Sequence, residues 1–238
     1  MQPITRFSEV TVFDAITAWE QWNLTEYTFK SECLLSVWRN LEKEQPELSS
    51  IIKYHLHQAD ERLAEPKLMP GPTGETNELY CAGRGVCALI VENNTSWAAV
   101  MAMLTAALIT GNSVVICCDD IDLNKVIESA ISTALPAHVV QIVAYDSYQE
   151  VIKSDIRITA FIGSDVTQMS INRLLAESEG VITPLVAETV DGTSTSGHDL
   201  VLTHDPSLVL SFITERTRTI NITAVGGNAT LLELGDQH

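Results

Sequence analysis

The strongest constraint on the fold is a regular alternation of short apolar runs and helical patterns in the middle of the chain. Five runs rich in β-branched residues are predicted as strands, at 85–91, 113–117, 139–143, 158–162 and 181–187. Helical segments follow the first four, at 96–110, 119–135, 147–153 and 164–178. Strands that are apolar on both faces are typical of a parallel sheet covered by helices, joined by right-handed crossovers. We therefore expect an α/β fold with a Rossmann-like, doubly wound parallel sheet of about five strands.

The segment before this alternation is predicted to be helical. Apolar residues recur at spacings of three and four over 13–41 and again over 47–64, which is the pattern of amphipathic helices. Thr25 is a candidate N-cap at a break in the first stretch. Residues 70–77, which follow, have the Pro and Gly content of a loop.

The end of the chain has the pattern of a β-hairpin. Apolar residues alternate with polar ones on both sides of Gly226 and Gly227, and glycines supply the positive φ angles that tight turns need. Because two isolated strands are marginal in water, the hairpin must lie on its own domain or on a partner. The predicted interaction residues are Ile220, Asn221, Ile222, Gly226, Gly227, Asn228 and Leu231. A short strand at 199–202 and a helical turn within 206–213 are expected before it.

Length and charge limit the classes of protein to consider. The 238 residues suit one globular unit. Its predicted parts are an N-terminal helical segment over 1–70, a Rossmann-like core over 71–195 and a β-flap over 196–238. The formal net charge of −17 disfavours nucleic acid and anionic membrane as partners, because both repel an acidic surface. No run approaches the ~20 apolar residues of a membrane helix, and the first residues lack a secretory signal pattern.

Cysteines and histidines give no sign of a metal site. The five cysteines are an odd number without paired spacing, which indicates reduced thiols in a cytoplasmic location. Cys117 and Cys118 end an apolar run, so we expect them to pack in the core. His55 and His57 are two apart on a predicted helix and point to different faces. Surface positions are expected for His198, in a polar loop, and for His204, at the end of a strand.

The junction after the first predicted strand argues against a simple Rossmann dehydrogenase. A dinucleotide fingerprint would place Gly-x-Gly-x-x-Gly there, so that the backbone can approach a pyrophosphate. Residues 92–96 read Glu-Asn-Asn-Thr-Ser instead. The chain also has no Gly-x-Ser-x-Gly elbow, P-loop or Cys-x-x-Cys motif.

Four segments in the correct order resemble the cofactor domain of aldehyde dehydrogenases. They are Gly-Val-Cys-Ala-Leu-Ile-Val-Glu-Asn-Asn-Thr-Ser at 85–96, Ala-Ala-Leu-Ile-Thr-Gly-Asn-Ser-Val-Val-Ile at 106–116, Ala-Phe-Ile-Gly-Ser at 160–164 and Pro-Leu-Val-Ala-Glu-Thr at 184–189. The resemblance implies that Asn94 matches the asparagine that holds the oxyanion. Glu188 matches the glutamate that activates water for deacylation. Gly163 and Ser164 match the turn that starts a helix beside the cofactor phosphates.

The nucleophile of that family has no counterpart in this chain. In aldehyde dehydrogenases a cysteine thiolate well after the glutamate attacks the aldehyde, and NAD receives the hydride. Here no cysteine follows Cys118, and only 50 residues follow Glu188. The family's ribose-contacting lysine is replaced by Cys117 or its neighbour. We therefore expect no catalytic residues and no bound cofactor, with NAD binding as the alternative. Asn94 and Glu188 are then interpreted as a helix-capping residue and a residue retained for the fold.

The pattern as a whole resembles one branch of these proteins. Residues 68–77, 85–192 and 217–235 are similar to the C-terminal domain of the long proline utilization A proteins, flavoenzymes that oxidise proline to glutamate. That resemblance implies a non-catalytic module whose hairpin packs across a Δ1-pyrroline-5-carboxylate dehydrogenase domain and helps to seal the cavity through which the intermediate passes. Two alternatives remain open. One is an active NAD-dependent Δ1-pyrroline-5-carboxylate dehydrogenase, and the other is a stand-alone oligomerisation or regulatory protein that forms a homodimer through the hairpin.

Overall fold

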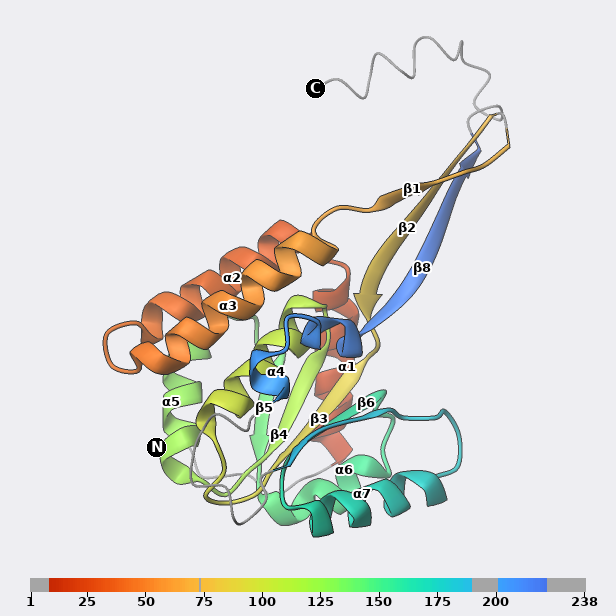
Figure 1. Cartoon of the computed structure of the whole chain (residues 1–238). Helices are drawn as coiled ribbons and strands as arrows, with labels where there is room; N and C mark the ends of the chain where they lie inside the picture. Colours follow the sequence, from red (N-terminus) through yellow and green to blue (C-terminus); the bar gives the residue numbers. More distant parts are fainter. Residues whose placement is uncertain (1–8, 73, 190–200, 222–238) are drawn as a thin grey trace.

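A five-stranded parallel sheet forms the centre of the molecule (Figure 1). The computed structural model describes residues 9–72, 74–189 and 201–221. The strands of the sheet are β3 (Val86–Val91), β4 (Ser113–Cys117), β5 (Val140–Val143), β6 (Ile158–Gly163) and β7 (Leu185–Thr189). Their order is β5-β4-β3-β6-β7, with every neighbouring pair parallel. The chain winds outward from β3 in both directions, which confirms the predicted doubly wound fold.

Helices cover both faces of this sheet, and each face has its own core. The helices that connect the strands are α4 (Trp97–Ile109), α5 (Ile121–Ile131), α6 (Tyr148–Ile152) and α7 (Asp165–Glu177), with a 3-10 turn η1 (Tyr145–Ser147) before α6. On β3, Cys87 and Leu89 belong to the core that contains α4, whereas Ala88 and Ile90 belong to the core that contains α6 and α7. Because successive side chains enter opposite cores, every residue of β3 is buried and its sequence is continuously apolar.

Three N-terminal helices extend the layers around the sheet. They are α1 (Glu9–Asn23), α2 (Tyr27–Leu41) and α3 (Pro46–Leu63). α1 ends in the core around α4, where Nε1 of the buried Trp22 donates a hydrogen bond of 2.9 Å to the Leu108 carbonyl. The N-cap predicted at Thr25 is wrong by one residue: Glu26 occupies that position, because the Thr25 hydroxyl donates to the Trp22 carbonyl at the end of α1, at 2.7 Å. Within the described ranges, no helix has the length and apolar character needed to cross a membrane.

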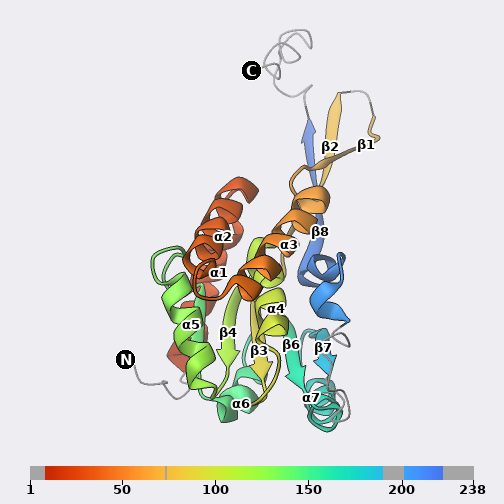
Figure 2. The same cartoon turned by 60° about the vertical axis from the view of Figure 1, so that its left-hand side comes forward.

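Three antiparallel strands form an arm that projects from the body of the molecule (Figures 1 and 2). They are β1 (Lys67–Met69), β2 (Glu75–Gly83) and β8 (Ile213–Asn221), in the order β1-β2-β8. β2 and β8 pair along their whole length, from Gly83 opposite Ile213 to Glu75 opposite Asn221. The loop predicted for 70–77 is therefore wrong at its end. Residues 75–77 are strand because a segment far along the chain supplies their hydrogen-bonding partner.

The segment between β7 and the arm contains two 3-10 turns, η3 (Leu202–His204) and η4 (Leu208–Phe212). η4 confirms the helical turn predicted within 206–213. The strand predicted at 199–202 is wrong for its described residues, 201 and 202, which lie in a turn and in η3. Of the predicted hairpin, Ile220 and Asn221 end β8. Ile222, Gly226, Gly227, Asn228 and Leu231 lie outside the described residues, and the boundaries at 70 and 195 stay predictions.

A buried asparagine fixes the base of the arm. Asn112 Oδ1 accepts hydrogen bonds from the Arg84 and Gly85 amides at 2.7 and 3.1 Å, and Nδ2 donates to the Ala107 carbonyl, the Thr110 hydroxyl and the Phe212 carbonyl at 3.1, 2.8 and 2.9 Å. Arg84 directly follows β2 and Phe212 directly precedes β8. One side chain thus holds the two points at which the arm leaves the body.

Candidate functional site

The carboxyl edge of the parallel sheet is where a doubly wound fold binds ligands, at the point where the strand order reverses. In this chain that point lies between β3 and β6. Glu92 and Asn94 come directly after β3, and Gly163 and Ser164 lie at the junction of β6 and α7. Glu188 lies near the end of β7, the strand next to β6. The fold therefore brings the sequence-predicted site residues to one edge, but their environments differ.

Asn94 lies exposed in the turn between β3 and α4. Its φ of 62° is in the left-handed region, which asparagine adopts more readily than most residues. The N-cap of α4 is Ser96, whose Oγ accepts a hydrogen bond from the Ala99 amide at 3.4 Å. The capping role interpreted for Asn94 therefore belongs to Ser96. Asn94 contributes the turn that leads from the strand to the helix.

Glu188 is buried, and its carboxylate serves the fold. Only 3% of the residue is exposed. Its Oε2 accepts hydrogen bonds from the Thr203 amide at 2.7 Å and from the Thr203 hydroxyl at 3.2 Å. The Thr203 carbonyl is in turn 2.9 Å from Nε2 of His55. A carboxylate held in this way ties η3 to β7, and its position differs from that of a base exposed to a reacting water molecule.

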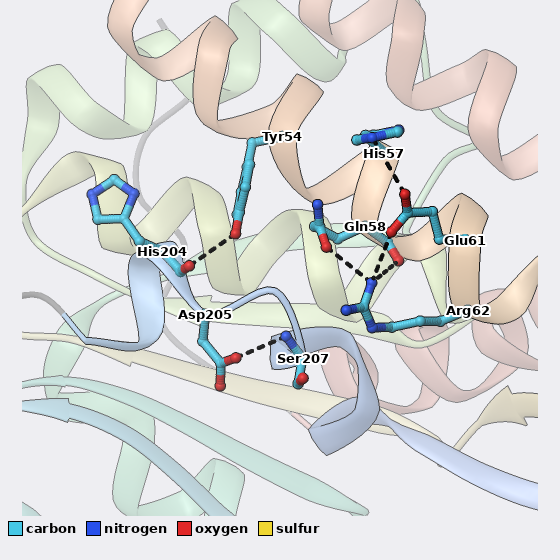
Figure 3. A network of polar contacts seen from close by, with 8 residues as sticks. All are labelled: Tyr54, His57, Gln58, Glu61, Arg62, His204, Asp205 and Ser207. Carbon is cyan, nitrogen blue, oxygen red and sulfur yellow. Dashed lines mark hydrogen bonds and ion pairs between the residues drawn. The ribbon is translucent and has the colours of Figure 1, made fainter.

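α3 holds the same segment through two consecutive residues. The Tyr54 hydroxyl donates to the His204 carbonyl at 2.9 Å (Figure 3), and the next residue, His55, contacts the Thr203 carbonyl. Burial lowers the pKa of His55, so its ring is neutral and Nε2 carries the proton that it donates. The sequence motifs did not single out this contact, because only burial and a partner on η3 distinguish His55 from the exposed His57. His204 is exposed, as expected, and His198 lies outside the described residues.

The start of α7 already binds an anion from elsewhere in the chain, the side chain of Glu92. The Ser164 amide and hydroxyl donate to the Glu92 carboxylate at 2.7 and 3.3 Å, and the Thr167 hydroxyl makes a further short hydrogen bond to it. A Cβ atom placed on Gly163 would lie 2.4 Å from Glu92 Oε2, so the carboxylate fills the space beside the glycine. Gly163 and Ser164, which the resemblance places next to a cofactor phosphate, face this carboxylate instead.

These residues do not fit the phosphates of NAD. A phosphate at the start of α7 would have to share its donors with Glu92 and would meet a like charge. After β4, where the family resemblance calls for a ribose-contacting lysine, two carboxylates are also engaged. Asp119 accepts from the Tyr145 amide at 2.9 Å, and Asp120 accepts from Nε1 of Trp97 at 2.9 Å while it caps α5. The carboxylates of Glu92, Asp119 and Asp120 at this edge of the sheet are therefore already hydrogen-bonded within the chain.

No cysteine has the environment of a reactive thiolate. Cys87, Cys117 and Cys118 are buried, which confirms the packing role predicted for the last two. Burial raises the pKa of Cys118 to about 11 and that of Cys87 to about 12, and it raises the pKa of Cys117 further. Cys33 and Cys81 are half-buried, and burial raises their pKa values too. Among the residues that the structure describes, no group of three His, Cys, Asp or Glu side chains is placed to hold a metal ion.

The strand order and the helices on both faces of the sheet define a Rossmann-type, doubly wound α/β protein. The chain belongs to the aldehyde dehydrogenase family, whose model matches residues 34–190. Among solved structures, a variant of proline utilization A from Bradyrhizobium japonicum is 26% identical, with a TM-score of 0.70 over 78% of this chain. A bifunctional proline utilization A is 25% identical, with a TM-score of 0.69 over 79% of this chain.

The similarity to other dehydrogenases extends to the fold alone. A 1-pyrroline-5-carboxylate dehydrogenase from Thermus, solved with bound NAD, has a TM-score of 0.66 over 77% of this chain and 42% of its own, at 18% identity. The present chain spans only 22% and 23% of the two proline utilization A chains. No curated protein sequence matches it.

Proposed function

We propose that the chain is a non-catalytic, aldehyde-dehydrogenase-like module of a proline catabolic system, and that its arm packs on and covers a Δ1-pyrroline-5-carboxylate dehydrogenase domain. Membership of the aldehyde dehydrogenase family and the similarity to proline utilization A structures support this setting. The observation that carries the proposal is the arm of β1, β2 and β8, which stands clear of the body (Figure 2).

The side chains at the sheet edge support a role without catalysis. Glu188, at the position of the family's deacylating glutamate, is buried and bonded to Thr203. All the cysteines have raised pKa values, whereas a nucleophilic cysteine needs a lowered one. The residues that would face cofactor phosphates face Glu92. The family's reaction therefore lacks a base, a nucleophile and a cofactor contact among the described residues.

The arm has the properties of a docking surface. β8 pairs with β2 on one side, and no described strand pairs with its other side. As an outer strand of the arm, β8 lies where a strand of a partner can be added to a sheet. Leu68, Met69 and Ile220 are apolar side chains of the arm that are 77%, 41% and 45% exposed. Exposed apolar groups gathered on a projecting arm favour contact with another protein surface.

A covering role gives this contact a chemical purpose. A dehydrogenase domain that handles a reactive aldehyde benefits when its cavity is closed, because closure retains the intermediate and excludes bulk water. A rigid arm attached to a folded body can cover such a cavity without supplying any reacting group. The arm here is anchored at both of its roots by Asn112.

The test mixes the full chain with a Δ1-pyrroline-5-carboxylate dehydrogenase domain of the same organism and measures the dissociation constant by calorimetry. Ile220→Lys on the arm should weaken binding about tenfold or more, because it places a charge in the contact. Ile182→Lys is the matched control, since Ile182 is an exposed isoleucine between α7 and β7, away from the arm. Equal effects of the two variants, or no complex with the wild-type chain, would contradict the proposal.

Two further measurements separate the alternatives. Oxidation of glutamate semialdehyde with NAD by the chain alone, at an ordinary enzyme rate, would contradict a non-catalytic role. Light scattering on the chain alone, before and after removal of residues from 217 onward, would reveal a homodimer held by the arm. In that case the partner of the arm is a second copy of the chain.

A further inference from the structure

The position of Glu92 at the reversal of strand order is fixed by the backbone. Val91, the last residue of β3, pairs with Ile162 of β6. The Glu92 amide then donates to the Ile162 carbonyl at 3.0 Å, which extends the contact between the two strands by one residue. The side chain of Glu92 therefore begins at the crevice where doubly wound folds bind a nucleotide.

The direction of the Glu92 side chain is equally well determined. Its carboxylate accepts hydrogen bonds from the Ser164 amide and hydroxyl, at the N-cap of α7, and from the Thr167 hydroxyl in the first turn. The start of a helix stabilises a negative charge through its free amides and its dipole. Hydrogen bonds to a charged acceptor are stronger than neutral ones. Glu92 thus uses the hydrogen-bond donors and the helix N-terminus that a phosphate bound in the same place would use.

The carboxylate of Glu92 also fills the space beside Gly163. Gly163 lies at the end of β6, and an added Cβ there would be 2.4 Å from Glu92 Oε2 and 2.6 Å from Cζ of Phe161. The carboxylate occupies the room that a glycine leaves for close approach. Burial is the main cause that raises the pKa of Tyr145 to about 12, and the charge of Glu92 is the second largest cause. The negative potential of this carboxylate therefore reaches the neighbouring segment after β5.

The geometry points to Glu92 as a resident anion that takes the place of a cofactor phosphate and keeps the crevice closed to dinucleotides. It is a specificity-determining residue of the chain, because it decides which anion the start of α7 holds. This inference does not rest on the arm or on any partner. A chain that fails to bind a dehydrogenase domain would leave it unaffected.

The experiment replaces the carboxylate and supplies an anion from solution. Glu92→Ala and Glu92→Gln are compared with the wild type by thermal unfolding in sodium pyrophosphate and in sodium chloride of equal ionic strength. We expect pyrophosphate to raise the Tm of Glu92→Ala by about 3 °C or more, because a ligand of the folded state stabilises it, and to leave the wild type unchanged. Glu128→Ala is the control, since it removes one negative charge from an exposed site on α5.

A second measurement reads the site directly and works in any variant that folds. In ¹H–¹⁵N spectra, the Ser164 amide of Glu92→Gln should shift on addition of pyrophosphate or NAD, whereas that of the wild type should not respond. Saturable binding of NAD or pyrophosphate to the wild type, with a shift of Ser164, would overturn the inference. Folded Glu92 variants that bind neither anion would overturn it as well.

Discussion

Oε2 of Glu188 lies 2.7 Å from the backbone nitrogen of Thr203 and accepts its hydrogen bond in a buried setting. The family resemblance gives the residue at this position the task of activating water. Here the same carboxylate satisfies a backbone amide of η3, and the Thr203 carbonyl continues the chain of contacts to His55 on α3. One acidic residue therefore connects β7, η3 and α3.

Glu188→Ala should destabilise the chain by about 1–3 kcal/mol, because the Thr203 amide would be left buried without an acceptor. Glu188→Gln should cost less, since its amide oxygen can still accept that hydrogen bond. Urea unfolding measures both changes. Glu177→Ala, at an exposed glutamate of α7, is the control and should stay within about 0.5 kcal/mol of the wild type. Equal stabilities of Glu188→Ala and the control would contradict a structural role for Glu188.

The stability contributed by His55 should decrease in acid. Burial is the main cause that holds the pKa of His55 below its ordinary value of 6.5. Below pH 6.5 the unfolded chain therefore takes up a proton at this residue before the folded chain does, and protonation favours unfolding. The stability difference between wild type and His55→Leu should be largest at pH 7 and should shrink as the pH falls through 6 to 5. A difference that does not change with pH would show that folding leaves the pKa of His55 unchanged.

Asn112→Ala should weaken both the core and the attachment of the arm. The substitution removes five hydrogen bonds and takes the Asn112 partner away from the buried Gly85 amide and Phe212 carbonyl. Losses of this kind add to about 3 kcal/mol or more. Relative to the wild type, the variant should show a larger increase in amide hydrogen exchange in β2 and β8 than in β3 to β6. Uniformly faster exchange across the molecule would mean that Asn112 stabilises the body without a special effect on the arm.

The sequence predicts the parallel sheet better than it predicts the arm, for a physical reason. A strand such as β3 is covered on both faces, so all of its residues are apolar and the strand is recognisable as a continuous apolar run. β2 is only partly buried and includes polar residues such as Glu75 and Asn77. Its strand conformation comes from pairing with β8, which a local pattern does not contain.

At the candidate site, too, the sequence motifs reveal the positions of residues but not their long-range contacts. The motifs draw attention to Asn94, Gly163 and Ser164, which lie where strands end: Asn94 after β3, Gly163 at the last position of β6 and Ser164 directly after it. They do not reveal that the Glu92 carboxylate crosses from β3 to the first turn of α7, since this depends on side-chain direction. A carboxylate directly after the first strand, where dinucleotide-binding proteins have glycine, was the available signal.

Thiol titration should separate the cysteines into two classes. Cys33 and Cys81 are half-buried, whereas Cys87, Cys117 and Cys118 are buried with strongly raised pKa values. An aromatic disulfide reagent at pH 8 should therefore react first with Cys33 and Cys81, and with all of the cysteines only after denaturation. Mass spectrometry of the labelled peptides identifies them. Rapid labelling of Cys117 or Cys118 in the native chain would show that the core around β4 opens.

Lys30 should make the chain more stable in mild alkali. Its side chain is buried at a cavity of about 330 Å³ between α2 and the arm, and its Nζ donates to the carbonyls of Thr25 and Asn23, the latter at 3.5 Å. Burial lowers the pKa of Lys30 to about 8, although nearby Glu26 opposes the change. The unfolded chain keeps its proton up to the ordinary value of about 10.4.

Between these two values the unfolded chain binds more protons at Lys30 than the folded chain does, so stability rises with pH in that window. The free energy of unfolding of the wild type, minus that of Lys30→Met, should therefore increase from pH 8 to pH 10. Comparing the two chains cancels the titration of groups that they share. Urea unfolding at pH 7.5, 8.5 and 9.5 measures the difference. A difference that stays constant or falls over this range would mean that Lys30 stays charged in the fold and is stabilised by its carbonyl partners and by the Trp22 ring, whose centroid lies 5.9 Å from Nζ.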